Sequence, residues 1–241
     1  MAVSQRVHVA PVGYENDRIV LPAERLDADR IVLLESAGDD EYPYPDRVRE
    51  RLDDRGIEHA SLECDIFDLY DSIGTIAAAI TANADDEVYV NLASGSKVTA
   101  IGGMIACMAT GATPYYARAE RYGDEADGVS EGVAELSRLP TYPIDRPSRE
   151  QVAVLAHLEE QGSTSKKRLI DFGRTAGLPF LAEHDASNVK AEYRLLDSHV
   201  LEPLVADGYV ELEAVGRRKR VHLTDRGADT LRAFRYVLDE R

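Results

Sequence analysis

The chain has 241 residues, 44% of them hydrophobic, enough for one large domain or two modest ones with cores of their own. No apolar run approaches the roughly 18–20 residues needed to span a bilayer, and the N-terminus lacks the apolar stretch of a signal peptide. We therefore expect no membrane segment. Cys64 and Cys107 are far apart and lie in apolar contexts, which favours reduced core cysteines and a cytoplasmic location.

The charge is strongly acidic and unevenly distributed. The formal net charge is −16, and only five of the 28 basic residues are lysines. An acidic, lysine-poor composition is typical of proteins kept soluble in high salt, so we interpret the chain as halophilic. Residues 1–140 hold 12 Lys and Arg against 27 Asp and Glu, whereas residues 141–241 hold 16 against 17. This asymmetry predicts two halves with different partners.

The first half alternates between strand and helix patterns. Strands are predicted at 7–12, 30–35, 58–63, 88–92 and 113–119, and helices near 16–27, 45–55, 68–82 and 96–110. Residues 128–138 alternate apolar and polar side chains and add a candidate edge strand. Such alternation builds βαβ units, so we expect an α/β, Rossmann-like parallel sheet with helices on both faces. Ligands of such sheets bind beyond the carboxyl ends of the strands.

The junction that follows the fourth predicted strand is the most informative segment. An apolar strand and an apolar helix flank the small polar turn Ala93-Ser94-Gly95-Ser96-Lys97. A helix start offers unpaired backbone N–H groups and a positive dipole end, which together with Lys97 favour an anion, above all a phosphate. The turn matches neither a Walker loop nor G-x-G-x-x-G. A βα turn that needs small residues only for close packing is the alternative.

Three prolines, Pro140, Pro143 and Pro147, indicate a semi-rigid linker at the same place as the charge break. We therefore predict a ligand-sensing domain over residues 1–139, a linker over 140–147 and a second domain over 148–241.

The second half begins with helical patterns. Ser148 and Gln151 form a capping-box pattern before a helix over 149–161. Ser163 is expected to cap a short helix over 166–172. A longer helix over 187–207 should direct Val189, Tyr193, Leu196, Val200 and Leu204 to the core, and Lys190 and Arg194 to solvent. Pro203 should bend or split this helix.

A basic β-hairpin and a closing helix complete the second half. Two strands, at 209–213 and 218–223, flank Gly216, and Thr224 caps a final helix over 225–240. The tip and the returning strand carry Arg217, Arg218, Lys219 and Arg220. Helices followed by a basic hairpin describe a winged helix-turn-helix, and the hairpin region resembles the wing of MarR-like regulators. We expect Lys190 and Arg194 to influence DNA sequence preference and the four wing cations to contact phosphates.

Two segments of the first half resemble the CARF domain, the CRISPR-associated Rossmann fold. One is the end of the first strand and its loop, Val9-Ala10-Pro11-Val12-Gly13-Tyr14. The other, Asn91-Leu92-Ala93-Ser94-Gly95-Ser96-Lys97, is similar to the family motif Asn-x-[Ser/Thr]-Gly-Gly-[Thr/Ser]-Lys, although Ala-Ser-Gly-Ser stands where the family often has Thr-Gly-Gly-Thr. The whole chain resembles a CARF–winged-helix transcription regulator of haloarchaeal type.

This resemblance implies a homodimer that binds a cyclic oligoadenylate or a similar small nucleotide in a two-fold pocket, without a cofactor. The residues it assigns to the pocket are Gly13, Tyr14, Asn91, Ser94, Gly95, Ser96, Lys97 and Arg118. Backbone N–H groups near Gly95, the two serine hydroxyls and Lys97 would bind phosphate. Asn91 would order the turn, Tyr14 (or Tyr115 or Tyr116) would stack on a base, and Arg118 would reach the rim.

Two enzymatic alternatives stay open. Some CARF domains cleave their cyclic ligand without metal, and Ser94 and Lys97 are suited to stabilise such a ring-opening transition state. Arg194 and His199 match the R-x4-H signature of HEPN ribonucleases, although a HEPN domain is all-helical and the predicted hairpin argues against it. The six histidines show no metal-binding spacing, and His8, within the first strand, is expected to be structural.

Overall fold

The computed structural model describes residues 4–36, 44–122, 130–142, 144–183, 188–215 and 218–239. The chain folds into two compact units, Met1–Asp145 and Arg146–Arg241. The division falls inside the proline-containing segment 140–147. The predicted domain limits themselves stay a prediction, and each unit is described on its own.

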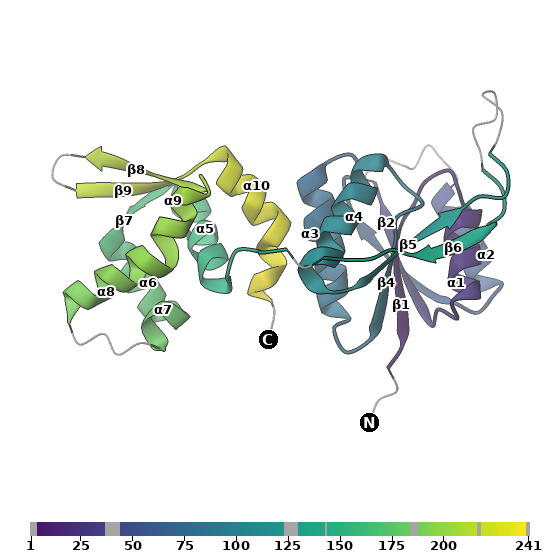
Figure 1. Cartoon of the computed structure of the whole chain (residues 1–241), viewed down its shortest axis with the longest axis horizontal. Helices are drawn as coiled ribbons and strands as arrows, with labels where there is room; N and C mark the ends of the chain where they lie inside the picture. Colours follow the sequence, from purple (N-terminus) through teal and green to yellow (C-terminus); the bar gives the residue numbers. More distant parts are fainter. Residues whose placement is uncertain are drawn as a thin grey trace. The chain divides into compact units, whose positions relative to one another are not determined.

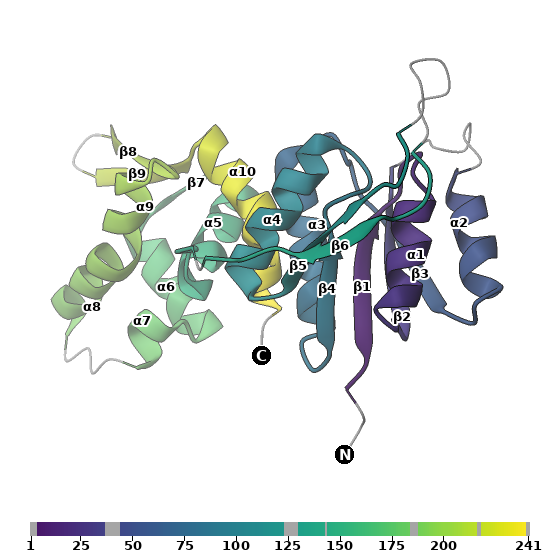
Figure 2. The same ribbon diagram turned by 45° about the vertical axis from the view of Figure 1, so that its right-hand side comes forward.

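The first unit is built on a six-stranded sheet with the strand order β3-β2-β1-β4-β5-β6 (Figure 1). The strands are β1 (Arg6–Pro11), β2 (Arg30–Glu35), β3 (Glu58–Glu63), β4 (Glu87–Asn91), β5 (Thr113–Arg118) and β6 (Glu135–Arg138). The first five are parallel, and β6 pairs antiparallel with β5 at the edge of the sheet (Figure 2). The chain reverses its winding direction between β1 and β4, and a crevice at such a point is where Rossmann-like sheets bind ligands.

Helices cover both faces of this sheet (Figure 1). On one face lie α1 (Asp17–Arg25) and α2 (Tyr44–Asp53), and on the other lie α3 (Leu69–Ala82) and α4 (Lys97–Thr110). The core under α1 and α2 consists of buried aliphatic side chains of β1, β2, the two helices and the adjoining loops. The predicted Rossmann-like α/β fold is therefore confirmed, because apolar runs long enough for parallel strands alternate with amphipathic helices.

The second unit is smaller and mostly helical. Its helices are α5 (Arg149–Gln161), α6 (Lys166–Ala176), α7 (Pro179–Ala182), α8 (Val189–Leu196), α9 (Glu202–Ala206) and α10 (Asp225–Phe234), with a π-helical segment, η2 (Asp197–Leu201), and a 3-10 segment, η3 (Arg235–Leu238). A three-stranded sheet has the order β7-β9-β8, from β7 (Ser163–Ser165), β8 (Val210–Val215) and β9 (Arg218–Leu223). Helix, strand, helices, hairpin and closing helix follow one another as in a winged helix.

The helix starts of this unit follow the sequence signals, with one correction. Ser148 and Gln151 form the predicted capping box, and Thr224 caps α10. The prediction that Ser163 caps the second helix is wrong: Ser163 lies in β7, and Ser165 accepts the Arg168 N–H as the cap of α6. Three residues are too few to show the period-2 pattern of a strand, so local propensity missed the pairing with β9.

The long predicted helix is interrupted. Leu196, Val200 and Leu204 are buried as predicted, but Val189 is 66% exposed, so the prediction that it faces the core is wrong. The helix is divided into α8, η2 and α9, with Pro203 in the first turn of α9. Proline has no N–H to bond the carbonyl four residues earlier, which disrupts the α-helical ladder and accounts for the interruption.

Candidate functional site

Two loops at the carboxyl edge of the large sheet lie against each other. One follows β1 and contains Gly13, and the other follows β4 and contains Gly95. A Cβ atom at Gly13 would stand 2.9 Å from the Gly95 nitrogen, and a Cβ atom at Gly95 would stand 2.5 Å from Cβ of Pro11. Only glycine at both positions permits this approach, so the two segments singled out in the sequence form one site.

The turn after β4 has the geometry expected of an anion-binding helix start. Gly95 has a φ of +74°, which favours glycine. Ser96 caps α4, because its Oγ accepts the Thr99 N–H at 3.0 Å and donates to the Ile66 carbonyl. The Ser96 hydroxyl therefore already serves the fold. Lys97 is exposed at the first position of α4, and no carboxylate among the described residues pairs with it.

Three buried polar atoms near these loops lack a hydrogen-bond partner. They are Ser94 Oγ, Glu15 Oε2 and Asn16 Oδ1, and Ser94 is only 2% exposed. The Glu15 oxygen lies at the Gly13 loop, 3.3 Å from where a Cβ of Gly13 would stand. Buried polar groups are nearly always hydrogen-bonded in folded proteins, to protein atoms or to ordered water, so these three atoms are available to water or to a ligand.

Asn91 and Arg18 hold the loops in place. Asn91 is fully buried; its Nδ2 donates to the Arg18 carbonyl at 2.8 Å and its Oδ1 accepts the Ala93 N–H at 2.8 Å. The Arg18 side chain is buried, donates to the Ala117 carbonyl at 2.9 Å, and pairs with Glu15 at 3.6 Å. Asn91 thus orders the turn, in the role the resemblance implied.

Sequence reasoning missed Glu15, Asn16 and Arg18. The available signal was their position directly after the first strand, because loops at strand carboxyl ends carry ligands. Arg18, however, is held by its hydrogen bond to the Ala117 carbonyl, 99 positions away, which no local pattern shows.

The aromatic and arginine candidates differ in their surroundings. Tyr14 is 59% exposed beside Gly13. Tyr116 is partly exposed, and the Arg18 guanidinium lies 5.2 Å from the centre of its ring. The suggestion that Tyr115 stacks on a base is wrong, because Tyr115 is buried in the sheet. Arg118 is exposed and forms an ion pair with Glu135 of β6 at 3.3 Å.

His8 is a core residue. It is fully buried, its Nδ1 lies 3.2 Å from the Tyr115 hydroxyl, and its ring contacts the ring of Tyr89. Burial, aided by the charge of Arg6, lowers the pKa of His8 to about 4, so the ring is neutral at pH 7. A neutral imidazole enclosed in the sheet is structural, in agreement with the expectation for His8.

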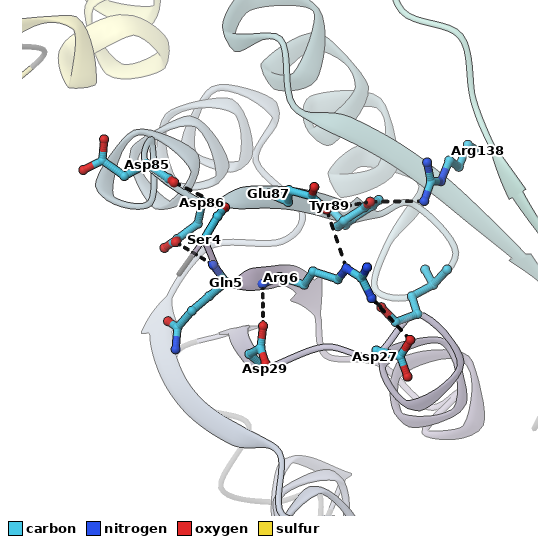
Figure 3. Close-up of polar contacts among 11 residues, drawn as sticks. Ser4, Gln5, Arg6, Asp27, Asp29, Asp85, Asp86, Glu87, Tyr89 and Arg138 are labelled. Carbon is cyan, nitrogen blue, oxygen red and sulfur yellow. Dashed lines mark hydrogen bonds and ion pairs between the residues drawn. The ribbon is translucent and has the colours of Figure 1, made fainter. Parts of the chain in front are cut away.

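The amino edge of the same sheet has the opposite character. There, Arg6 pairs with Asp27 at 3.3 Å and with Glu87 at 3.6 Å, and its backbone N–H donates to Asp29 (Figure 3). Asp86 accepts the Gln5 N–H at 2.9 Å. Carboxylates gather at this edge and are satisfied by local partners. At the other edge lie the unpartnered atoms of Ser94, Glu15 and Asn16, and Lys97, which has no partner among the described residues.

The DNA-contacting candidates lie on two elements of the second unit. Lys190 and Arg194 are exposed on α8, four residues apart and therefore on one face of the helix. Lys219 and Arg220 are exposed on β9. Arg218 lies in β9, where only its backbone is described, and Arg217 lies outside the described residues.

The alternative ribonuclease pair is set in a different fold from the one it requires. Arg194 and His199 are both exposed and fall on α8 and η2, in a unit with a three-stranded sheet. A HEPN domain is all-helical, so this alternative is disfavoured. Within the described ranges, no group of three His, Cys, Asp or Glu residues is arranged to hold a metal ion, and no helix is long and apolar enough to cross a membrane.

Comparisons with known families agree with the division into two units. Residues 6–122 match the family model HFX_2341_N, described as an N-terminal domain, and residues 150–235 match the DUF6293 C-terminal winged helix domain. The chain therefore joins a Rossmann-like α/β domain to a domain that matches a winged helix model, and both the Rossmann-like fold and the winged helix were predicted from the sequence. No curated protein sequence matches it.

The chain is also similar to solved structures of low sequence identity. Can2 from Sulfobacillus thermosulfidooxidans, solved with cyclic tetra-adenylate, is 12% identical with a TM-score of 0.43, over 95% of this chain and 62% of that one. Csm6 from Enterococcus italicus, solved with cyclic hexa-2′-fluoro-hexa-dAMP, is 11% identical with a TM-score of 0.43, over 85% and 56%. Protein VC1899 from Vibrio cholerae is 14% identical with a TM-score of 0.41, over 96% and 65%. The chain spans less than two thirds of each.

Proposed function

We propose that this protein is a dimeric, ligand-responsive transcription regulator. Its CARF-like unit binds a cyclic oligoadenylate or a similar small nucleotide, and its winged helix binds DNA. The observation that carries the proposal is the site at the carboxyl edge of the sheet, where the buried, unpartnered Ser94 hydroxyl and the unpaired Lys97 follow one another in a glycine-dependent turn.

The chemistry of this edge suits a phosphorylated ligand with a polar base. A phosphate oxygen is a strong acceptor, so it can receive hydrogen bonds from Ser94 and from backbone N–H groups at the start of α4. Lys97 adds a point charge. Glu15 Oε2 and Asn16 Oδ1 are acceptors without partners, and they require donors such as the exocyclic amino group of a base.

An acidic unit is an unfavourable place for a polyanion unless its carboxylates lie elsewhere. Asp27, Asp29, Asp86 and Glu87 do lie at the amino edge, where Arg6 and backbone donors engage them (Figure 3). Glu15, which Arg18 pairs with, lies close to the turn, and so does Asp65, which precedes Ile66, whose carbonyl accepts the Ser96 hydroxyl. Lys97 and the positive dipole end of α4 supply the attraction for a phosphate against these two carboxylates.

The proposed dimer uses the outer face of α4. Ile101 on this helix is 57% exposed, and Val98, Ile105 and Met108 at neighbouring helical positions are partly exposed. An exposed apolar stripe on a charged domain is typical of an interface between subunits. Ile101 lies one turn from Lys97, so a second copy packed here would bring two anion-binding turns to one two-fold axis.

In this proposal the ligand controls the DNA-binding unit through the dimer. A nucleotide that contacts both copies favours one dimer geometry over another, because only a difference in affinity between the two can shift their populations. Winged helices of a dimer must match the spacing of their half-sites, so a change in dimer geometry alters DNA affinity.

The test begins with the nucleotides that copurify with the native protein, identified by mass spectrometry. Calorimetric titration with cyclic tetra-adenylate and cyclic hexa-adenylate then measures affinity for wild type, Ser94→Ala and Lys97→Ala. A hydrogen bond to a charged group contributes about 1.5–3 kcal/mol, so we expect each substitution to weaken binding by roughly 10- to 100-fold. Linear products in the same samples would identify the ring-nuclease alternative.

Arg47→Ala is the matched control, because Arg47 is an exposed cation of α2 with no partner in the described part of the chain. The affinity of the Arg47→Ala variant for each cyclic nucleotide should equal that of wild type. If wild type binds neither ring and no nucleotide copurifies, the proposed ligand class is wrong.

A further inference from the structure

The first turn of α6 has an unfavourable sequence for a helix start. It carries three consecutive cations, Lys166, Lys167 and Arg168, and no acidic residue. The positive end of the helix dipole favours acidic residues at this position and disfavours cations. In the same unit, α5, α8 and α10 each have an acidic residue in the first turn. The three cations therefore point to a role that is not stabilisation of their own helix.

Two of these three side chains are available to a partner. Lys166 is half-buried and forms an ion pair with Asp197 at 2.5 Å, which fixes the first turn of α6 to the end of α8. Lys167 and Arg168 are exposed, and within the described ranges their side chains have no hydrogen bond, ion pair or ring contact.

The three-stranded sheet places a third unpaired cation, Arg220, beside the start of α6. Ser165, the cap of α6, stands opposite Arg220 of β9 in the strand register. Arg220 is exposed and likewise has no side-chain partner among the residues that the structure describes. Glu213 stands opposite Arg220 on the other side, but its carboxylate lies 2.9 Å from His222 Nε2. We call Lys167, Arg168 and Arg220 the α6–β9 patch.

Unpaired cations are concentrated on a few elements of the second unit. Residues 141–241 hold 16 basic residues against 17 acidic ones, so carboxylates are about as numerous as cations in this half. Among the described Lys and Arg side chains, those without any contact lie on α6, α8 and β9, apart from two in the first unit. They are Lys167, Arg168, Lys190, Arg194, Lys219 and Arg220, and in the first unit Arg47 and Lys97.

We propose that the α6–β9 patch binds backbone phosphates of duplex DNA. The proposal rests on the DNA binding proposed above and extends it, because it adds α6 to a surface that otherwise consists of α8 and the β8–β9 hairpin. The Ser165–Arg220 register pair and the Lys166–Asp197 ion pair place the first turn of α6 between β9 and the end of α8. Lys167 and Arg168 then neutralise phosphates between the groove that α8 reads and the strand that the hairpin contacts.

The experiment measures the salt dependence of DNA binding by the full-length protein. A fluorescein-labelled duplex of mixed sequence is titrated at a series of KCl concentrations and followed by fluorescence anisotropy. The slope of log affinity against log salt changes by about 0.9 for each phosphate contact. For the double variant Lys167→Ala/Arg168→Ala we expect a slope shallower by about 1.8 and weaker binding to every sequence. We also expect a higher Tm, because two cations leave the positive end of a helix dipole.

The rise in Tm separates this proposal from a structural role, which would lower Tm and leave the slope unchanged. Arg47→Ala removes one free cation from the first unit and should leave the slope as in wild type. An unchanged slope in the double variant, with a shallower slope in Lys219→Ala, would overturn the α6–β9 patch and leave DNA binding in place. Absence of salt-dependent binding by wild type would overturn both.

Discussion

At the scale of single residues, two glycines decide whether the candidate site can form. Gly13 and Gly95 lie on loops that follow different strands, and each leaves room for the backbone of the other loop or for Pro11. Gly95 also has a positive φ, a conformation that glycine adopts without steric cost.

Replacing Gly95 with alanine should destabilise the first unit. A non-glycine residue at positive φ costs about 1–2 kcal/mol, and the added Cβ would overlap Pro11, which costs roughly 1–3 kcal/mol more. Gly56→Ala is the matched control, because Gly56 has a φ of +66° but no atom lies within 4 Å of the place that its added Cβ would occupy. Urea unfolding measures the free energy of unfolding of both variants. Equal losses would show that the contact with Pro11 does not contribute to the cost at position 95.

At the scale of elements, α8 and β9 present cations for which we propose different contacts with DNA. Lys190 and Arg194 lie on a helix, whose side chains can reach base edges in a major groove. Lys219 and Arg220 lie on an extended strand of the hairpin, a position suited to the sugar-phosphate backbone. The π-helical segment η2 ends α8 early, so the exposed part of the helix is its first two turns, where Val189 also faces solvent.

Alanine substitutions should separate these two uses. Lys190→Ala or Arg194→Ala should relax preference at particular bases, at a cost of about 1–3 kcal/mol for the preferred sequence. Lys219→Ala should weaken binding to all DNA sequences alike. Selection of bound duplexes from a random pool, followed by sequencing, measures preference for each variant. An unchanged consensus in both α8 variants would argue against α8 as the reading helix.

Elements with a clear hydrophobic period were predictable from the sequence. Strands β2 and β3 and helix α5 have the expected bounds, because the continuous apolar run of β2, the alternation in β3 and the helical pattern of α5 are local signals. Strand β7 and the π-helical segment were not predictable. β7 exists because it pairs with β9, more than fifty residues later, and η2 depends on how the chain accommodates Pro203.

The candidate site was predictable only in part. Gly95, Ser96 and Lys97 could be found because a strand, a small turn and a helix start are local patterns. The buried state of Ser94 and the unpartnered atoms of Glu15 and Asn16 result from the packing of loops far apart in sequence. Arg118 was plausible from its position after β5, but its pairing with Glu135 depends on β6.

At the scale of the whole molecule, the two units differ in how they use charge. In the first unit, carboxylates at the amino edge of the sheet are engaged by Arg6 and backbone donors, and Lys97 at the start of α4 has no partner among the described residues. In the second, unpaired cations gather on three elements. Such a division suits the two partners proposed above, a small ligand on the first unit and DNA on the second.

Ile101→Asp tests the dimer as a whole. A carboxylate in the middle of an apolar interface is costly to desolvate, so we expect a shift from dimer to monomer, measured by sedimentation velocity. Affinity for the cyclic nucleotide and for a two-half-site duplex should fall together with dimerisation. Ile101→Leu should preserve dimerisation and the affinities for the cyclic nucleotide and for the duplex. A variant Ile101→Asp that stays dimeric would exclude α4 as the interface.

The orphaned polar atoms at the carboxyl edge have a thermodynamic consequence. Ser94, Glu15 and Asn16 bury polar atoms that form no hydrogen bond with another protein atom in the described structure. A molecule that meets these groups binds the folded state and raises its stability, by about 2.7 kcal/mol at a hundredfold excess over its dissociation constant. The melting temperature of the unmodified protein is therefore a direct measure by which candidate nucleotides can be ranked.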